Sequence, residues 1–276
     1  MSTNEEFVKL ISSTEKFLTQ QQELYGDMLF ISKTEAPAEE PAQTAQVLLP
    51  RPGADEIDMF HDTSLTVHHT RISGEAILRE YPNEAWTASK NLIDLNAAIN
   101  TCTKCSLGHT RKKFVFGVGN PQADVVVVGE APGADEDEQG EPFVGRGGQL
   151  LTKILEAIKF PRNEVYICNI LKCRPPNNRD PQADEIDFCE PYLWKQLEII
   201  KPKMILCAGR IAGQSLLKTK ATLTELRGKV HDYRGIPLMV TYHPAALLRN
   251  PNWKRPCWED VQEFRRLYEE MKKKEE

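Results

Sequence analysis

Four of the seven cysteines are spaced as ligands of a metal ion or a metal cluster. Cys102 and Cys105 form a C-x-x-C unit, and Cys173 and Cys189 flank the polar loop Arg174–Phe188, just outside the predicted regular elements. Two thiolates from a short loop and two from a longer excursion can close a tetrahedral four-sulfur site. The spacing leaves both zinc and an iron–sulfur cluster open. A redox-active dithiol at the C-x-x-C unit is the weaker alternative, because no thioredoxin-like strand precedes it.

The other three cysteines share an apolar setting, inside strand candidates or at the start of the last helix. Free cysteine is among the most buried residue types, so we expect these three in the core: Cys168, Cys207 and Cys257.

Three further segments combine small residues with groups able to bind or polarise a ligand. Gly129–Gly148 is rich in glycine and carboxylates around a lone aromatic residue, Phe143; Asn169–Asp180 begins with an amide; His243–Asn250 begins with an imidazole. A glycine-rich phosphate cradle is the simplest interpretation of the first segment. Its acidic residues and the absence of lysine from the Walker position argue against that interpretation.

The elements that must position these segments are apolar strands alternating with helices. Such alternation predicts an α/β fold with three αβα layers around a central four-stranded parallel sheet. Ligands bind beyond the carboxyl ends of such strands, where the three polar segments begin, so we expect the segments to form one crevice. The strand candidates are Ala123–Gly129, Val165–Ile170, Met204–Ala208 and Pro237–Tyr242, and the helix candidates are Leu92–Thr101, Gln149–Lys159, Ala183–Ile200, Ile211–Leu217 and Glu259–Lys273.

The charge of the 276-residue chain is unevenly distributed. The net charge is −5, but residues 1–60 hold four basic against eleven acidic residues, a balance of −7, so the remainder carries +2. An acidic tail therefore masks a mildly basic body that is compatible with a polyanionic partner. No apolar run has the length of a membrane span and no secretory signal is evident, so we expect a cytoplasmic protein without a membrane partner.

The N-terminal part differs in composition from the rest. Residues 1–31 place apolar side chains at helical spacing, which predicts an amphipathic helix that docks a protein partner or self-associates. Residues 32–88, rich in Ala, Pro, Glu and Gln, are predicted to be a mostly disordered linker. Residues 89–276 then form the globular domain.

Several motifs together resemble the family 4 uracil-DNA glycosylases, the iron–sulfur type. They are G-E-A-P-G at Gly129–Gly133, the strand-end Asn169, H-P-A-A-L-L-R at His243–Arg249 and the four spaced cysteines. The resemblance covers about residues 91–272. It implies that residues 89–276 are a monomeric glycosylase domain of base excision repair, which excises uracil from single- or double-stranded DNA and leaves an abasic site.

The resemblance also implies roles for individual residues. Phe143 would stack on the everted base, Asn169 would pair with uracil N3–H and O4, and His243 would stabilise charge on O2. Glu130 or Glu136 would position the attacking water or stabilise the sugar cation, and we favour Glu130. The predicted uracil-binding set is Glu130, Ala131, Pro132, Glu136, Phe143, Asn169 and His243, and the predicted catalytic set is Glu130, His243 and Glu136.

The family's other features extend the prediction to DNA and to a cofactor. Leu247 would fill the gap left in the duplex, and Arg249, Arg174 and Arg179 would contact DNA phosphates. Related uracil glycosylases carry Asp in the first motif where this chain has Glu130, which leaves the general base open. The predicted ligands of a [4Fe-4S] cluster, with zinc the less favoured metal, are Cys102, Cys105, Cys173 and Cys189.

Two rival functions remain at this point. One is a relative that acts on other deaminated bases or stays covalently attached to the abasic site; the covalent type has a basic insertion that is absent here between Gly148 and Gln149. The other is a catalytically silent module that binds DNA or a protein, against which the intact set of Glu130, Phe143, Asn169 and His243 argues.

Overall fold

The computed structural model describes residues 74–275. The predicted N-terminal helix at residues 1–31 and the predicted linker up to residue 73 lie outside the described residues. Within the described part, no helix is long and apolar enough to cross a bilayer.

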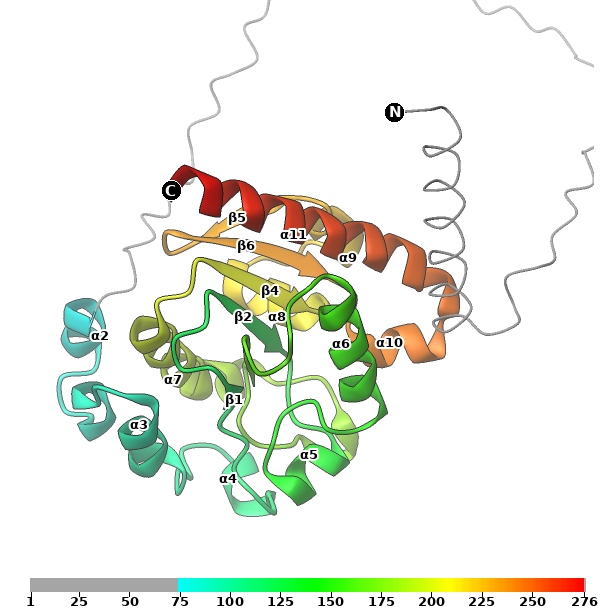
Figure 1. Ribbon diagram of the computed structural model, residues 1–276. Coiled ribbons are helices and arrows are strands. Elements are labelled where there is room, and N and C mark those ends of the chain that lie inside the picture. The colour runs from blue at the N-terminus through cyan, green and yellow to red at the C-terminus, as the bar shows by residue number, and fades with distance from the viewer. Residues whose placement is uncertain (1–73, 276) are drawn as a thin grey trace, which may run out of the picture. The chain divides into compact units, whose positions relative to one another are not determined.

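The described residues form a mixed six-stranded sheet in the order β1-β3-β2-β4-β6-β5 (Figure 1). The four central strands are parallel, as predicted, and β1 and β5 are added antiparallel at the two edges. The sequence did not predict β1 because it has only two residues. The strands are β1 (Val118–Gly119), β2 (Val125–Gly129), β3 (Tyr166–Asn169), β4 (Met204–Ala208), β5 (Val230–Tyr233) and β6 (Ile236–Thr241).

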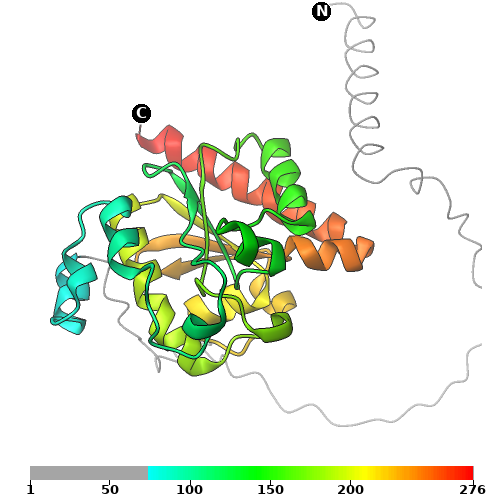
Figure 2. The same cartoon turned by 90° about the horizontal axis from the view of Figure 1, so that it is seen from below.

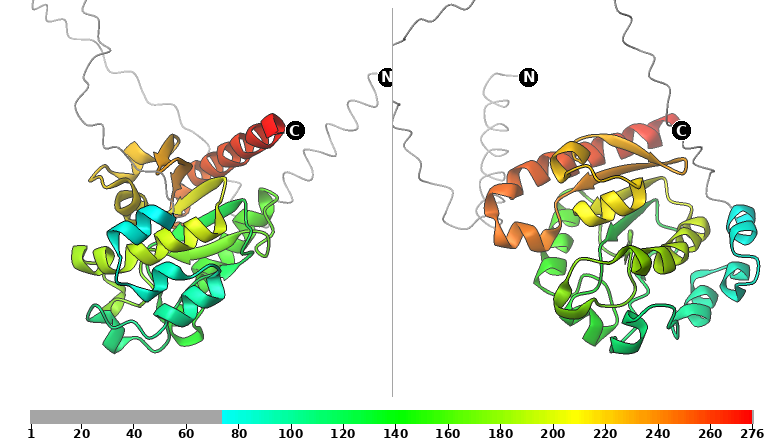
Figure 3. Two further views of the ribbon diagram at one scale, coloured as in Figure 1. Left: turned by 90° about the vertical axis from the view of Figure 1, so that its left-hand side faces the viewer. Right: turned by 180° about the vertical axis from the view of Figure 1, so that it is seen from behind.

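Helices cover both faces of this sheet, which confirms the three-layer prediction (Figure 2 and Figure 3). One apolar core joins the sheet to α2 (Gly74–Glu80), α3 (Leu92–Ile99), α7 (Ala183–Ile200) and α8 (Arg210–Leu217). The opposite core joins it to α6 (Arg146–Ala157), α10 (Pro244–Arg249) and α11 (Lys254–Glu275). The shorter helical elements are η2 (Ala85–Ala88), α4 (Leu107–Thr110), α5 (Ala134–Gln139), η3 (Pro176–Asn178), α9 (Leu223–Leu226) and η4 (Pro251–Trp253).

Burial on both faces explains why the central strands are continuously apolar. All five residues of β2 and all five of β4 are buried, and successive side chains of each strand enter the two opposite cores. The bounds predicted for β4 and α7 match the structure, whereas α6 starts three residues earlier than predicted and α11 five residues earlier. Because the four central strands are parallel, their carboxyl ends lie at one edge of the sheet, as the predicted crevice requires.

The predicted linker extends too far toward the C-terminus. Residues 74–88 hold α2 and η2, and the side chains of Ile77 and Trp86 are buried in the same core as α7. The Trp86 ring packs edge-on against Tyr192, with centroids 5.3 Å apart. The order of this segment comes from contacts with a distant helix, which residues within the segment do not specify.

Candidate active site

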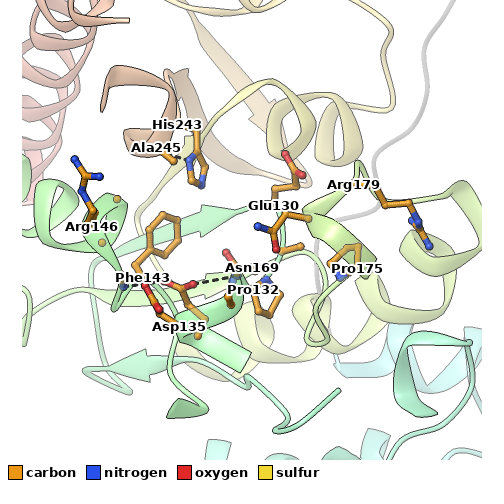
Figure 4. Close-up of a pocket in the computed structure, with 18 of the residues that line it drawn as sticks. Glu130, Pro132, Asp135, Phe143, Arg146, Asn169, Pro175, Arg179, His243 and Ala245 are labelled. Carbon is orange, nitrogen blue, oxygen red and sulfur yellow. Dashed lines mark hydrogen bonds between the residues drawn. The ribbon is translucent and has the colours of Figure 1, made fainter. Parts of the chain in front are cut away.

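The segments after β2, β3 and β6 meet in one pocket at the carboxyl edge of the sheet (Figure 4). The cavity has a volume of about 460 Å³, within the range of small-molecule sites. Glu130, Asn169 and His243 each come from a different segment and all line it. The predicted convergence is confirmed.

Asn169, the last residue of β3, has an unusual side chain. It is only 2% exposed, and its Oδ1 is a buried polar atom without a hydrogen-bond partner. A buried acceptor left unpaired costs about 1–3 kcal/mol, and such groups are rare outside functional sites. Gly129 allows this placement, because a Cβ atom there would overlap Oδ1 and lie 2.5 Å from Cζ of Phe143. The pocket therefore presents an acceptor to a ligand N–H group.

Phe143 and His243 form an aromatic wall beside Asn169. Their rings are stacked, with centroids 5.4 Å apart and an interplanar angle of 26°. Phe143 is buried and adopts a left-handed backbone conformation, with φ of 55°, which is uncommon for a bulky residue. Strain of this kind concentrates at ligand sites, where the surrounding structure holds it.

The protonation of His243 is set by its surroundings. Its Nδ1 accepts a hydrogen bond from the backbone N–H of Ala245 at 3.2 Å, so the neutral ring carries its proton on Nε2. Burial, reinforced by the charge of Arg249, lowers the pKa of His243 to about 4. The ring is therefore a neutral hydrogen-bond donor at physiological pH.

The carboxyl group of Glu130 has a pKa near neutral pH. Burial and then the charge of Asp180 raise its pKa to about 7, while Arg210 and Arg249 act in the opposite direction. A pocket carboxyl group with such a pKa is the kind that catalysis uses.

The carboxylate of Glu136, the other predicted catalytic residue, accepts hydrogen bonds from backbone N–H groups. Its Oε1 accepts hydrogen bonds from the N–H groups of Val144 and Gly145, at 2.9 and 3.0 Å, and its Oε2 accepts from Gly133 at 3.1 Å. It closes the segment that carries Phe143. The arrangement opposes the predicted catalytic role of Glu136, because the oxygens that would bind water already hold the loop.

Other pocket residues include both predicted and unpredicted positions. Ala131 and Pro132 line the pocket, as the sequence predicts. Asp135, Arg146 and Asp180 line it as well, and the sequence analysis assigned no role to them. Each of these three residues lies in a segment that follows a strand end, and that position is the sequence signal that could have indicated them.

The prediction that Leu247 fills the gap left in the duplex is wrong. This side chain is 1% exposed and belongs to the core beneath α6 and α11, whereas the adjacent Leu248 is 39% exposed. The reason is the packing of α10, which turns the face bearing Leu247 toward that core.

The three predicted phosphate-binding arginines have different environments. Arg249 is exposed at the rim of the pocket. Arg179 also lines the pocket, but its guanidinium group donates to both carboxylate oxygens of the buried Glu185, at 2.9 and 2.6 Å. The half-buried Arg174 donates to Asn178. Arg249 is the one of the three for which the structure gives no competing side-chain acceptor within the described residues.

The four predicted cysteine ligands pack against one core, beside α3, β3 and α7. Cys189 lies inside α7, within the helix predicted at Ala183–Ile200, so the expectation that it lies just outside regular structure is wrong. Three of the sulfurs accept hydrogen bonds: Cys102 from the hydroxyl of Tyr192 at 3.2 Å, Cys173 from Arg111 at 3.4 Å and Cys189 from the backbone N–H of Lys172 at 3.3 Å.

This environment fits a thiolate-bound group. Hydrogen bonds to sulfur are a usual feature around protein iron–sulfur clusters. Burial raises the pKa of Cys173 to about 11 and that of Cys189 to about 12, and a bound metal would favour their thiolate forms. Within residues 74–275, no group of three His, Cys, Asp or Glu side chains is placed so that it could hold a metal ion. The other three cysteines are buried, as predicted.

Comparisons with known proteins show what the chain is similar to. Residues 116–262 match the family model described as the uracil DNA glycosylase superfamily. The chain is 43% identical over 186 residues to the type-4 uracil-DNA glycosylase of Archaeoglobus fulgidus, covering 64% of this chain and 94% of that protein. It is 41% identical over 181 residues to the type-4 enzyme of Thermotoga maritima, with coverage of 64% and 94%. To the type-5 uracil-DNA glycosylase of Pyrobaculum aerophilum it is 32% identical over 146 residues, with coverage of 47% and 64%.

Proposed function

Because the chain belongs to the uracil DNA glycosylase superfamily, we propose that it excises uracil from DNA by hydrolysing the N-glycosidic bond, with the pocket around Asn169 receiving the everted base. The product is an abasic site, and the activity is that of a hydrolase in DNA repair. The observation that carries the proposal is the unpartnered, buried Oδ1 of Asn169.

Asn169 supplies the specificity for uracil. Its Oδ1 accepts from uracil N3–H, and its amide group donates to O4. Cytosine presents an acceptor at N3 and a donor at the 4-position, so both pairings fail. A buried polar group that loses its partner is costly, which makes this discrimination strong.

Phe143 and His243 act on the bound base in different ways. The phenyl ring supplies a stacking surface, which is worth about 1–3 kcal/mol per base. The neutral imidazole donates from Nε2 to uracil O2, where negative charge develops as the glycosidic bond breaks. A donor that is fixed before the reaction stabilises this charge without reorganisation.

The two carboxylates divide the remaining work. Glu130, ionised above its pKa of about 7, orients the attacking water and stabilises the positive charge that develops on the sugar. Glu136 is a positioning residue that fixes the loop carrying Phe143 through three backbone hydrogen bonds.

The cysteine set is proposed to hold a [4Fe-4S] cluster, in keeping with the type-4 relatives. Cys102, Cys105, Cys173 and Cys189 would supply four thiolates. When bound, the cluster would contribute a structural cross-link with no part in bond cleavage. The residues themselves tie the segment after β3 to α7 and to the C-x-x-C loop.

The cofactor proposal has a direct spectroscopic test. Purified protein should absorb broadly near ~400 nm, as thiolate-bound iron–sulfur clusters do, and zinc would not. Cys102→Ala should lose this absorption, whereas Cys207→Ala, at a buried strand position, should keep it. A colourless protein containing stoichiometric zinc would contradict the proposal.

Contacts with nucleic acid extend beyond the pocket. We assign Arg249 to a phosphate beside the everted nucleotide and Arg174 to a second phosphate of the same DNA.

We expect the protein to act where chromosomal DNA is held. Residues 1–31 are proposed to dock a protein partner, and the domain is proposed to act as a monomer. Size-exclusion chromatography with light scattering of the full chain tests the last point.

One assay tests the activity against its rivals. Oligonucleotides with a single uracil, single- or double-stranded, are incubated with the protein and treated with hot alkali. Strand scission at uracil is the expected result. An alkali-resistant protein–DNA adduct would instead identify a covalent relative, and intact DNA would identify a binding module.

A further inference from the structure

A lysine side chain lies fully buried behind the pocket. Lys172 follows Asn169 by three residues and is 0% exposed. Lysine is almost never fully buried unless its ammonium group is paired. Burial lowers the pKa of Lys172, and both the ammonium and the amine form of its side chain can donate hydrogen bonds.

The Nζ atom of Lys172 makes two hydrogen bonds in the interior. Lys172 Nζ donates to the backbone carbonyl of Asn169 at 2.9 Å and to Oε1 of Gln196 at 2.6 Å. Gln196 is itself buried and fixed, because its Nε2 donates to the Phe116 carbonyl and the Tyr166 hydroxyl, both at 3.0 Å. The lysine is therefore held by one rigid acceptor while it holds the Asn169 carbonyl.

The main chain after Asn169 is also fixed from the other side. The N–H of Ile170 donates to the Gly129 carbonyl at 2.9 Å, and the N–H of Leu171 donates to the Glu130 carbonyl at 3.0 Å. These bonds tie the segment to β2, and Lys172 ties it to the core. Together they fix the peptide unit next to the Asn169 side chain.

We propose that Lys172 is a positioning residue for base recognition, whose Nζ holds the Asn169 carbonyl so that the unpartnered Oδ1 stays directed at the base. This inference rests on the proposed pairing of Asn169 with uracil. Recognition sites need their groups held within about 0.5 Å, and groups behind the contacting residues provide this. The backbone N–H of Lys172 also donates to Cys189, so the same residue connects the cysteine set to the pocket.

The test separates base recognition from the rest of DNA binding. Two affinities are measured for the full chain: for a single-stranded oligonucleotide carrying 2′-fluoro-2′-deoxyuridine, which resists hydrolysis, and for the same oligonucleotide with a tetrahydrofuran abasic analogue. Their ratio reports the contribution of the base. Lys172→Met should lower this ratio about tenfold, equivalent to ~1.4 kcal/mol, with abasic binding unchanged within about twofold.

Lys195, a second buried lysine, lies on α7 and provides the matched control. Lys195 is buried and pairs with Glu198 at 2.8 Å, away from the pocket residues. Lys195→Met should leave the ratio unchanged. A wild-type ratio in Lys172→Met, or an equal loss in both variants, overturns the proposal.

Two further variants keep the inference testable on its own. If Lys172→Met does not fold, Gln196→Met removes the fixed acceptor and should lower the ratio about threefold, the scale of one hydrogen bond; an unchanged ratio overturns the proposal. Asn169→Ala tests the premise. If it keeps the wild-type ratio, the proposed role of Asn169 fails, whereas a loss in Asn169→Ala without one in Lys172→Met refutes only the role of the lysine.

Discussion

The phenyl ring of Phe143 is stacked against the imidazole ring of His243, at a centroid distance of 5.4 Å (Figure 4). The two residues are a hundred positions apart in the chain: Phe143 lies between α5 and α6, and His243 lies between β6 and α10. The contact sets both rings beside Asn169, so it defines one wall of the pocket.

Phe143→Leu should weaken uracil excision while keeping an apolar side chain at this wall. Losing the stacking surface, worth about 1–3 kcal/mol, should lower kcat/KM at least about fivefold. The measurement is steady-state excision from a uracil oligonucleotide, with affinity for an abasic oligonucleotide as the control. Unchanged kcat/KM would remove Phe143 from the role of base-stacking residue.

Asn169→Asp should reduce the preference for uracil over cytosine. A carboxylate accepts at both oxygens, so it no longer donates to uracil O4 and would accept from the cytosine amino group. The ratio of kcat/KM values on matched uracil and cytosine oligonucleotides should fall at least about tenfold, with or without loss of total activity. A wild-type ratio would exclude Asn169 from recognition.

Excision should depend on the ionisation of Glu130 and not on that of His243. The rate should rise with pH through about 7, because the Glu130 carboxylate is the active form, while the imidazole, with a pKa of about 4, stays neutral throughout. The kcat/KM profile of Glu130→Gln should be flat and low between about pH 5 and about pH 8. A retained acidic limb in this variant would assign the limb to another group.

Glu130 should also make stability depend on pH. Folding raises its pKa from 4.5 to about 7, so the folded state binds the proton more tightly, and the contribution of Glu130 to stability falls as the pH rises through this window. Glu130→Gln should therefore unfold at a higher temperature than the wild type above pH 7. The difference should shrink below pH 4.5, where both side chains are neutral. Thermal unfolding at both pH values measures this effect.

Glu136→Gln should destabilise the loop that carries Phe143. An amide has one acceptor oxygen where the carboxylate has two, so at least one of the N–H groups of Gly133, Val144 and Gly145 loses its partner, at a cost of about 1–3 kcal/mol. Denaturant unfolding measures the loss. Glu138→Gln, at an exposed ion pair with Lys112, is the control and should stay within about 0.5 kcal/mol of the wild type.

Arg249→Gln and Arg179→Gln should have different effects. The first should weaken DNA binding and reduce the salt slope by about one, because one phosphate contact is lost. The second should lower the unfolding free energy by about 2 kcal/mol, because the buried Glu185 loses its cationic partner and keeps only the Gln182 N–H donor. DNA affinity across a salt series and denaturant unfolding distinguish the two; a salt slope reduced equally in both variants would show that Arg179 also contacts DNA.

The layered fold and the pocket were predictable because they depend on local patterns. The apolar runs of β2 and β4 require burial on both faces, and parallel strands bring their carboxyl ends to one edge. Asn169 and His243, placed directly after such runs, could therefore be expected at one site. The order of residues 74–88 was not predictable, because Trp86 is buried by Tyr192, a residue more than a hundred positions away.

The amino-acid order alone determined the central parallel strands, the longer helices of residues 89–276 and the side chains that stand at the strand ends, since propensity and periodicity act over a few residues. Only the tertiary structure decided how neighbouring, chemically similar residues divide their roles. Leu247 is buried and Leu248 exposed because of the face that α10 turns inward, and Glu136 binds backbone while Glu130 keeps a raised pKa because of how one loop closes. These outcomes depend on which distant groups surround each side chain, and nothing within a few residues of either pair specifies that.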